Sequence, residues 1–524
     1  MSMMHSMARA LLVLFLACAA VAARGAEAPA DWRQVALDQV RAAAAGAPAP
    51  ASIASVAARP WQVSAQLYVG GEVVAFEASI GSTLVAAATE VGARFRRSLA
   101  PDLLRGGRLF LTVRGPGVDG MLVEYEGKAL AVVGDVTAVP TFDRAQVLAT
   151  VRDQRDYLLR QIDPVHHGFF KVYSARFDRS QSRLRVTYTA SALWTLLQLR
   201  ELEPDPRIDA VLGPAAEFLL SMQVRDGEHR GAFHYALDPV SGEKRERYVV
   251  GTASKSIFTL LELHRRSGER RFLDAANAAG QWLLGRVQRD GRVLAVTLRS
   301  RSSGQWETPP QQSVLYSCET LSALSRLYGA TQDRHYRRAA RRIAERLLQQ
   351  GAQGGFVFGD DFRRPNTVST SWVAMALLDY TAAVRDERMQ RALFTAANQV
   401  LLRQIEMGNN LLDNGRYFDT WATSGNGWMN EVLVPVYRRC LDTGRTGCER
   451  YRIAMNRSAR WLLQNTYTPA NSYHLPNPAR ARGGAIRNSK VEAVRTDAVC
   501  HAANSLVGLL QLPPTTLRDP RYPL

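Results

Sequence analysis

The 524-residue chain is poor in cysteine and has no long hydrophobic run beyond its first residues. No later segment reaches 18 uninterrupted apolar residues, so we expect no transmembrane span in the mature chain. Its glycine and proline contents are ordinary and exclude collagen-like or proline-rich low-complexity sequence. A composition of 46% hydrophobic and 22% charged residues excludes a mainly disordered protein.

Lysine is also scarce, since it supplies five of the 66 basic residues, yet the formal net charge is +18. An arginine bias of this kind, together with many alanines, is typical of a GC-rich genome. A polyanionic partner is the functional alternative: an acidic glycan, a membrane surface or a nucleic acid. Export of the chain would leave no role for nucleic acid.

Residues 1–26 have the pattern of a secretory signal peptide. A basic residue precedes thirteen almost wholly apolar residues, Leu11 to Ala23, which are too few to cross a bilayer. Cleavage is expected between Ala22 and Ala26, and the mature protein is predicted to be periplasmic or secreted. The residues around Cys18 form a poor lipobox, so lipoprotein anchoring is a minor alternative.

Four cysteines remain after such cleavage. Cys440 and Cys448 flank a short turn, Leu-Asp-Thr-Gly-Arg-Thr-Gly, and an oxidising compartment favours a local disulfide between them. Cys318 and Cys500 lie in apolar helical runs and are expected to be buried free thiols. No cysteine pair has zinc-ribbon spacing, so we predict neither a metal nor a cofactor.

Glycine-marked turns recur with a period of about sixty residues. The marks are Gly168, Gly231, Gly291, Gly355, Gly415 and Gly484, most of them beside an aromatic residue. Such a period indicates a repeat architecture.

Each mark separates two kinds of helical pattern. An amphipathic helix precedes it, at 143–161, 207–223, 270–287, 333–350, 386–405 and 448–465. A helix that is apolar nearly all round follows it, at 187–201, 251–265, 312–328, 368–383, 428–440 and 494–511. Six buried and six half-exposed helices predict a mainly α fold, an (α/α)6 toroid over residues 141–524. All long links should emerge at the end with the inner-helix N-termini, where we expect binding.

Residues 27–140 predict a small α+β domain before the toroid. Strands are expected at 61–69, 73–76, 108–113 and 121–125, and a helix over 82–97 with Ser82 or Thr83 as its cap. Residues 41–51, rich in alanine and proline, are interpreted as a linker or a loose start.

The alternating helices with Gly-Gly-Phe turns resemble the six-hairpin glycosidase-like superfamily. This resemblance covers about residues 143–511 and includes glycoside hydrolases, polysaccharide lyases, sugar epimerases and terpene-cyclase-like proteins. It implies a substrate funnel at the inner-helix N-terminal end. The ending Gly483-Gly484, Arg495-Thr-Asp497 and His501 is similar to one in uncharacterised bacterial toroid proteins and implies no reaction.

The N-terminal domain is faintly similar to the AMMECR-type α+β family. The similarity lies in Leu67-Tyr-Val-Gly-Gly71, the helix that follows, and Gly117-Val-Asp-Gly-Met-Leu122. The cysteine-containing motif of that family is replaced here by Phe76-Glu-Ala-Ser-Ile-Gly81, so no shared site is implied.

Four residues are the catalytic candidates: Glu319, Glu431, Asp497 and His501. Two carboxylates across a sugar would serve glycoside hydrolysis. Lyase or epimerase chemistry needs a base beside a uronate C5, and His501, Tyr316, Lys255 or Tyr188 could supply it, with Arg495 neutralising the carboxylate. The structural alternatives are a helix-dipole or His501 contact for Asp497, and backbone amides of the long loops for both glutamates.

Aromatic residues beside polar ones suggest sugar contacts, because aromatic faces stack on sugar rings. The substrate-binding candidates are Trp306, Asp361, Trp421, Trp428, His474 and Arg495. Phe356 and Tyr417 follow the glycine marks and are expected to fill the repeat turns instead.

The sequence thus predicts an exported carbohydrate-active enzyme that acts on an envelope or secreted polysaccharide or oligosaccharide, with hydrolysis ahead of elimination and epimerisation. A non-catalytic glycan-binding or envelope assembly protein is the alternative. Six arginines on the solvent face of 333–350 weaken the argument for an acidic glycan. Arginines in or beside the long links keep it open: Arg363, Arg364, Arg480, Arg482, Arg487 and Arg495.

Overall fold

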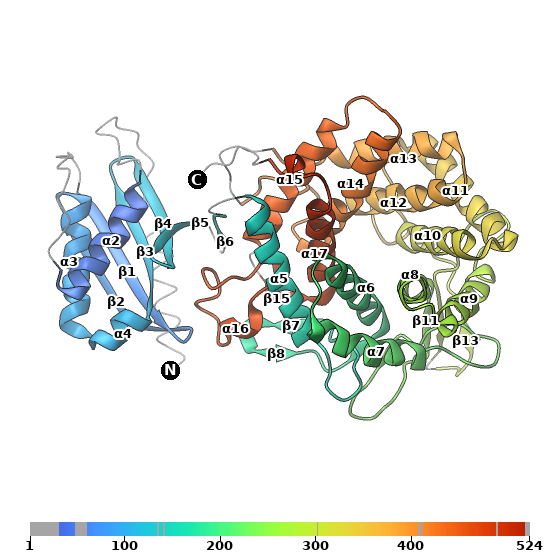
Figure 1. Cartoon of the computed structure of the whole chain (residues 1–524), viewed down its shortest axis with the longest axis horizontal. Helices are drawn as coiled ribbons and strands as arrows, with labels where there is room; N and C mark the ends of the chain where they lie inside the picture. The colour runs from blue at the N-terminus through green and yellow to red at the C-terminus, as the bar shows by residue number, and fades with distance from the viewer. Residues whose placement is uncertain are drawn as a thin grey trace. The chain divides into compact units, whose positions relative to one another are not determined.

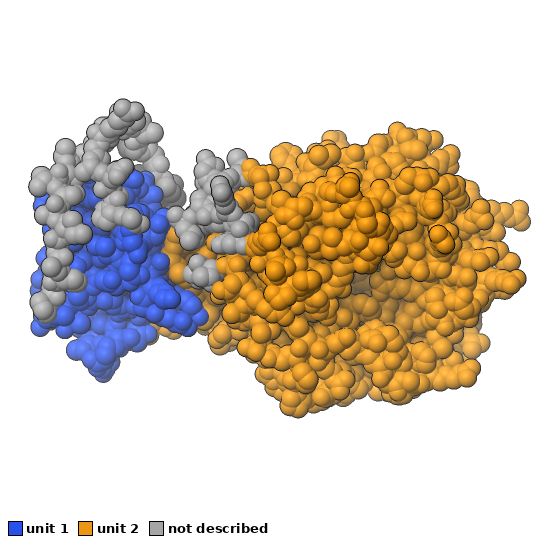
Figure 2. All heavy atoms as spheres, turned by 45° about the horizontal axis from the view of Figure 1, so that its top comes forward, with its two compact units in different colours: residues 1–68, 73–129 blue, residues 69–72, 130–524 orange. Residues whose placement is uncertain are grey.

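The computed structural model describes residues 31–47, 60–133, 136–139, 142–300, 302–406, 410, 412–488 and 491–518 (Figure 1). The expected signal peptide, its cleavage site and the lipobox lie outside these residues. The chain forms two compact units, residues 1–68 with 73–129 and residues 69–72 with 130–524 (Figure 2). Among the described helices, none has the length and apolar character needed to cross a membrane.

The first unit is built on strands β1 to β4 of a six-stranded sheet of order β2-β1-β3-β4-β5-β6. The strands of this sheet are β1 (Trp61–Val69), β2 (Glu72–Gly81), β3 (Arg108–Gly115), β4 (Val118–Tyr125), β5 (Lys128–Val133) and β6 (Val136–Thr137). Buried residues alternate along β1 and β3, as expected for strands with one covered face. The predicted small α+β domain is therefore present.

Three helices accompany this sheet: α2 (Trp32–Ala45), α3 (Leu84–Ser98) and α4 (Pro101–Gly106). Helix α3 begins where predicted, because the Thr83 side chain accepts a hydrogen bond from the Ala86 N–H. The prediction of a linker at 41–51 was wrong over its first half. Ala42 to Ala45 belong to α2, which packs on α3 and ends at Gly46 in the left-handed conformation.

The second unit contains the twelve predicted toroid helices. The outer helices are α5 (Arg144–Arg160), α7 (Pro206–Ser221), α9 (Arg270–Leu284), α11 (Arg334–Gly354), α13 (Glu387–Leu401) and α15 (Glu449–Gln464). The inner helices are α6 (Val186–Leu202), α8 (Val250–Ser267), α10 (Val314–Thr331), α12 (Thr367–Ala383), α14 (Thr423–Asp442) and α17 (Thr496–Leu510). A short helix, α16 (Pro478–Ala481), lies in the last crossover.

The inner helices form a closed ring. Each contacts the next inner helix, and α17 lies between α14 and α6 (Figure 1). Their all-round apolar character follows from this position, because both flanks of each helix are covered. Outer helix α11 shows the complementary pattern, with Tyr336, Ile343 and Leu347 buried and arginines on its exposed side.

Most glycine marks bring a crossover against the next outer helix, whereas Gly355 has open space around it. Gly231 adopts a φ of 91°, and a Cβ there would lie 2.0 Å from the carbonyl oxygen of Ala278 in the next outer helix. In the last repeat the equivalent residue is Gly483 rather than Gly484. Its Cβ would lie 1.9 Å from the Asp153 carbonyl oxygen in α5, so the last crossover packs on the first outer helix.

Short strands that sequence reasoning missed order the long crossovers. They are β7 (Val172–Ser174), β8 (Arg179–Ser180), β9 (Leu184–Arg185), β10 (Ala236–Leu237), β11 (Arg247–Val249), β12 (Val296–Arg299), β13 (Trp306–Glu307), β14 (Ile486–Asn488) and β15 (Val491–Arg495). Strands β9, β11 and β15 lead directly into α6, α8 and α17. Pairing of β15 with β7 joins the last crossover to the first.

The cysteine predictions are confirmed. Cys440 and Cys448 form a disulfide across the turn between α14 and α15, with their Cα atoms 5.8 Å apart. Cys318 and Cys500 are buried free thiols.

Candidate functional site

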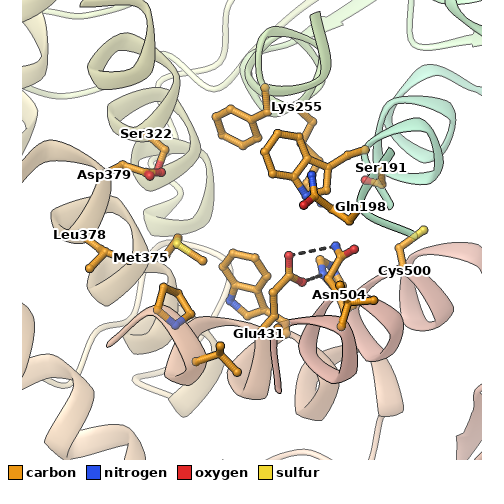
Figure 3. A pocket seen from close by; sticks show the side chains of 18 of the residues that line it. Ser191, Gln198, Lys255, Ser322, Met375, Leu378, Asp379, Glu431, Cys500 and Asn504 are labelled. Atoms are coloured by element: carbon orange, nitrogen blue, oxygen red, sulfur yellow. Dashed lines mark hydrogen bonds and ion pairs between the residues drawn. The ribbon is translucent and has the colours of Figure 1, made fainter. Parts of the chain in front are cut away.

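A cavity of about 280 Å³ lies inside the ring and is lined by side chains from all six inner helices (Figure 3). The lining begins more than one turn inside the inner helices and extends along α17 to its C-terminal end, as far as Gln511. It therefore lies deeper than the crossover mouth at which the sequence placed the binding residues.

A carboxylate and a histidine from neighbouring inner helices meet in this cavity. Glu431 of α14 accepts a hydrogen bond from Nδ1 of His501 in α17 at 2.6 Å, and another from Nδ2 of Asn504 at 3.0 Å (Figure 3). The two helices approach closely at Gly427, where a Cβ would lie 2.9 Å from the Ala502 nitrogen. Among the described residues, Nε2 of His501 has no hydrogen-bond partner.

Two tryptophans form a flat wall beside this pair. Trp372 of α12 and Trp428 of α14 stack with their ring centroids 3.6 Å apart and their planes 18° apart. Trp428 also meets the His501 ring at 5.1 Å in an edge-on arrangement. Lys255 of α8 places its Nζ 5.6 Å from the Trp372 ring. The cavity thus combines an aromatic surface, a cation and a histidine–carboxylate pair.

A second carboxylate lines the cavity but is already engaged. Asp379 of α12 forms an ion pair with Arg326 of α10, with Nε 3.1 Å from Oδ2. The Arg326 guanidinium is packed between Trp194 and Phe258, at 5.3 Å and 4.4 Å from their ring centroids. Arg326 and Asp379 thus form an ion pair in the cavity wall where α10 and α12 meet.

Asp497 and Arg495 lie at the start of α17 and do not line the cavity. Arg495 binds both oxygens of Asp497, at 2.9 Å and 2.5 Å, and donates to the Tyr188 hydroxyl at 3.2 Å. Burial would raise the pKa of Asp497, but the Arg495 guanidinium outweighs it and holds that pKa below its ordinary value. The expected contact of Asp497 with His501 was wrong, because each has a different partner.

Glu319 is a third carboxylate of the inner ring and lies outside the cavity lining. It is 3% exposed, and its Oε2 has no hydrogen-bond partner among the described residues. Burial raises the pKa of Glu319 to about 7. The expected contact with backbone amides of the long loops is absent from its described surroundings, which include Gly251 and Tyr316.

The predicted binding residues in the crossovers lie apart from the cavity. Trp306 stacks on Tyr248 with centroids 5.0 Å apart, and the Asp361 carboxylate accepts a hydrogen bond from the Gln312 N–H at 2.7 Å. Trp421 is 44% exposed and lies 3.7 Å under the Arg416 guanidinium.

His474 pairs with Glu492 at 2.8 Å, through its Nε2. Tyr417 fills its repeat turn, as predicted, and Phe356 packs partly buried against the core.

Of the ten predicted site residues, the cavity brings together Glu431, His501 and Trp428. Sequence reasoning missed Trp372, Asn504, Arg326 and Asp379. A usable signal was present, because each is a bulky or polar residue inside an otherwise apolar inner helix. No group of three metal-ligating side chains occurs within the described part of the chain.

Comparison with solved structures agrees with this architecture. The chain is similar to the cellobiose 2-epimerase of Bacillus thermoamylovorans, with 12% identity, a TM-score of 0.53, and coverage of 70% of this chain and 99% of that one. It is also similar to the unsaturated glucuronyl hydrolase of Bacillus sp. GL1, with 12% identity, a TM-score of 0.52, and coverage of 69% and 96%.

A family 76 glycoside hydrolase from Bacteroides thetaiotaomicron matches with 11% identity, a TM-score of 0.50, and coverage of 86% and 93%. Residues 144–510 have an (α/α)6 toroid fold, to which these similarities correspond. No family model and no curated protein matches the sequence. The AMMECR-type resemblance of the first unit stays a prediction.

Proposed function

We propose that this protein is a carbohydrate-active enzyme that binds a sugar ring of a polysaccharide or oligosaccharide in the toroid cavity. The Glu431–His501 pair beside the stacked tryptophans carries this proposal. A sugar ring offers an apolar face that packs on an aromatic wall and hydroxyl groups that need polar partners. The cavity supplies both within one ring of helices.

The arrangement favours proton transfer by His501. Glu431 fixes the orientation of the imidazole through Nδ1 and would stabilise the imidazolium that forms when Nε2 accepts a proton. Nε2 would take that proton from a sugar carbon made acidic by an adjacent carbonyl or carboxylate group. Delivery of a proton to the other face of that carbon by water or a second acid gives epimerisation, and the imidazolium then returns its proton to solvent. Loss of the oxygen substituent on the neighbouring carbon, which leaves as an alcohol with the proton from the imidazolium, gives elimination.

Hydrolysis, which the sequence placed first, is the second candidate reaction. It needs one carboxyl group to donate a proton and another to act as nucleophile or base. Both oxygens of Glu431 accept hydrogen bonds and Asp379 is bound to Arg326, so neither is free for that role in the geometry observed. A substrate that displaced Arg326 from Asp379 would restore the hydrolytic option.

The other base candidates fit less well. Burial raises the pKa of Tyr316 to about 12 and that of Tyr188 still higher, so both phenols hold their protons near neutrality. Arg495, expected to neutralise a uronate, already binds Asp497 through both of its carboxylate oxygens.

Incubation of the purified chain with neutral and acidic polysaccharides in deuterated water tests this proposal. Proton transfer places deuterium on a sugar carbon or yields an unsaturated product, and hydrolysis yields new reducing ends without carbon-bound deuterium. We expect His501→Asn to lower kcat by about 10²- to 10⁴-fold. His335→Asn, an exposed histidine of outer helix α11, is the matched control and should keep full activity.

The readouts separate the alternatives. New reducing ends without deuterium, retained by His501→Asn, would contradict the assignment of His501 and favour hydrolysis. Tight glycan binding without any product from the whole panel would favour a non-catalytic glycan-binding or assembly protein. The remaining proposal, that the protein is periplasmic or secreted, is supported by the Cys440–Cys448 disulfide, because such bonds persist in oxidising compartments.

A further inference from the structure

Four basic side chains surround the end of the ring that carries the inner-helix N-termini: Lys171, Arg185, Arg247 and Arg363, called here the basic collar. Arg185 immediately precedes α6, and Arg247 begins the strand that leads into α8. Arg363 lies just before α12, and the Lys171 carbonyl accepts a hydrogen bond from the Thr496 N–H at the start of α17. The collar thus draws on four of the six inner helices.

The collar lacks counter-charges of its own. None of its four members forms an ion pair with a described residue, and Nε of Arg247 is buried without a hydrogen-bond partner. The arginines of outer helix α11 differ, since Arg341 and Arg346 pair with carboxylates and the others are exposed. Lys171, Arg185 and Arg247 are half-buried, where an uncompensated cation is costly.

Tyrosines lie between these cations. Arg185 donates to the Tyr235 hydroxyl at 2.8 Å, and the Arg247 guanidinium lies 5.1 Å from the centre of the same ring. Nζ of Lys171 lies 5.8 Å from the Tyr188 ring. Burial lowers the pKa of Lys171, and repulsion from Arg185 and Arg495 lowers it further.

The carboxylates nearby form no ion pair with the collar. Asp360 and Asp361, beside Arg363, accept hydrogen bonds from backbone N–H groups, and Glu246, beside Arg247, pairs with Arg299. Asp497 is bound by Arg495, and Glu319 is buried beneath the collar with its pKa raised to about 7. The positive ends of the inner-helix dipoles point toward the same opening and add to the field. An anion at this end of the ring would meet several unpaired donors and aromatic faces, and Lys255, which lines the cavity, lies five residues into α8 from the same end.

We propose that the basic collar binds the carboxylates of an acidic glycan, and that the substrate of the cavity is a chain of uronate sugars. Only the identity of the substrate rests on the proposed function. The collar would bind the anionic chain whether or not His501 acts on it. Guanidinium groups bind carboxylates through two parallel hydrogen bonds, and the tyrosine faces suit the rings between successive carboxylates.

The experiment is a binding titration of the full chain by calorimetry. The probes are hexamers of galacturonate, mannuronate and hyaluronan, each beside its methyl-esterified or carboxyl-reduced form, which keeps the sugar and removes the charge. We expect at least one acidic hexamer to bind ten times or more tightly than its neutral form, and its affinity to fall with added salt.

A matched pair of variants locates the binding. Arg185→Gln with Arg247→Gln should weaken binding of that hexamer by about a hundredfold, because each lost charged hydrogen bond accounts for roughly tenfold. Arg338→Gln with Arg342→Gln removes the same charge from exposed positions of α11 and should leave affinity unchanged. Lys171→Gln provides a second collar variant, and unfolding curves verify that each variant is folded.

Several results would overturn the inference. Equal binding of acidic and neutral hexamers, or an equal loss in the collar and α11 variants, would show that the collar has no such role, as would equally tight binding of a single-stranded DNA of matched charge. Failure of the proposed function would look different. Acidic hexamers would then bind at the collar but be recovered without carbon-bound deuterium and without new reducing ends. Turnover of neutral glycans alone would retain the function and reject the collar.

Discussion

Substitution of Glu319 by Gln should remove a pH-dependent loss of stability. The side chain is 3% exposed, and burial raises its pKa from the ordinary 4.5 to about 7. The folded state therefore holds this proton more tightly than the unfolded state does. The stability that the protonated carboxyl contributes is complete below about pH 4.5 and is lost as the pH rises through 7.

The magnitude follows from the size of that pKa difference. At 1.36 kcal/mol for each pKa unit, ionisation of the buried group costs about 3 kcal/mol of unfolding free energy once the pH exceeds 7. Glu319→Gln keeps the shape of the side chain and cannot ionise. The unfolding free energy of the variant, relative to that of the native protein, should therefore rise by about this amount between pH 4.5 and pH 8.

Urea unfolding of both proteins, followed by tryptophan fluorescence at several pH values, gives the difference directly. Contributions from other titrating groups cancel in that difference, because both proteins share them. A difference that stays flat across this range would refute the reasoning, since it would mean that Glu319 is solvated or paired in the folded protein. Glu345→Gln, which removes a carboxylate from outer helix α11, should show no comparable gain.

Three further predictions concern the scaffold and the cavity. Replacement of Cys440 and Cys448 by serine should lower stability by about 2.5 kcal/mol, from the entropy of closing a loop with a separation of 8 residues, and a reducing agent should reproduce the loss in the native protein. Gly231→Ala should cost about 3 kcal/mol in denaturant unfolding, whereas Gly242→Ala, at a positive φ with open space around it, should cost about 1 kcal/mol. Trp372→Ala should raise KM by about tenfold for any glycan that the protein turns over, with a smaller change in kcat, and an unchanged KM would remove the aromatic wall from the binding model.

The architecture was accessible from the sequence because helical periodicity and glycine spacing are local signals. The outer stripe of Tyr336, Ile343 and Leu347 and the all-round apolar α12 each report burial without knowledge of their neighbours. Helix α2 was missed because an alanine-rich segment carries weak periodicity, and its helical state depends on packing against α3.

The site was harder to predict from the sequence, because its geometry depends on how deep each residue lies along the ring axis. His501 lies four residues after Asp497, and that spacing alone suggested a pair. Its actual partner, Glu431, is 70 residues away and is selected by how closely α14 and α17 pack at Gly427. Sequence spacing contains no measure of that approach. The crossover tryptophans were overvalued for the same reason, since departure from a repeat marks a local feature and not a position in the cavity.

The contact between the first and last helices of the ring has a consequence for how the order of the helices along the chain can be changed. Arg144 at the start of α5 donates a hydrogen bond to the Leu510 carbonyl at the end of α17, at 2.8 Å, so the first and last turns of the toroid are neighbours. A short peptide could bridge them, and the circle could be opened instead at the exposed Gly268 turn between α8 and α9 without separating any two packed helices. In the native order, by contrast, His501 belongs to α17, the last of the twelve ring helices along the chain. A nascent chain therefore has neither a closed circle nor a complete cavity until that last segment is made.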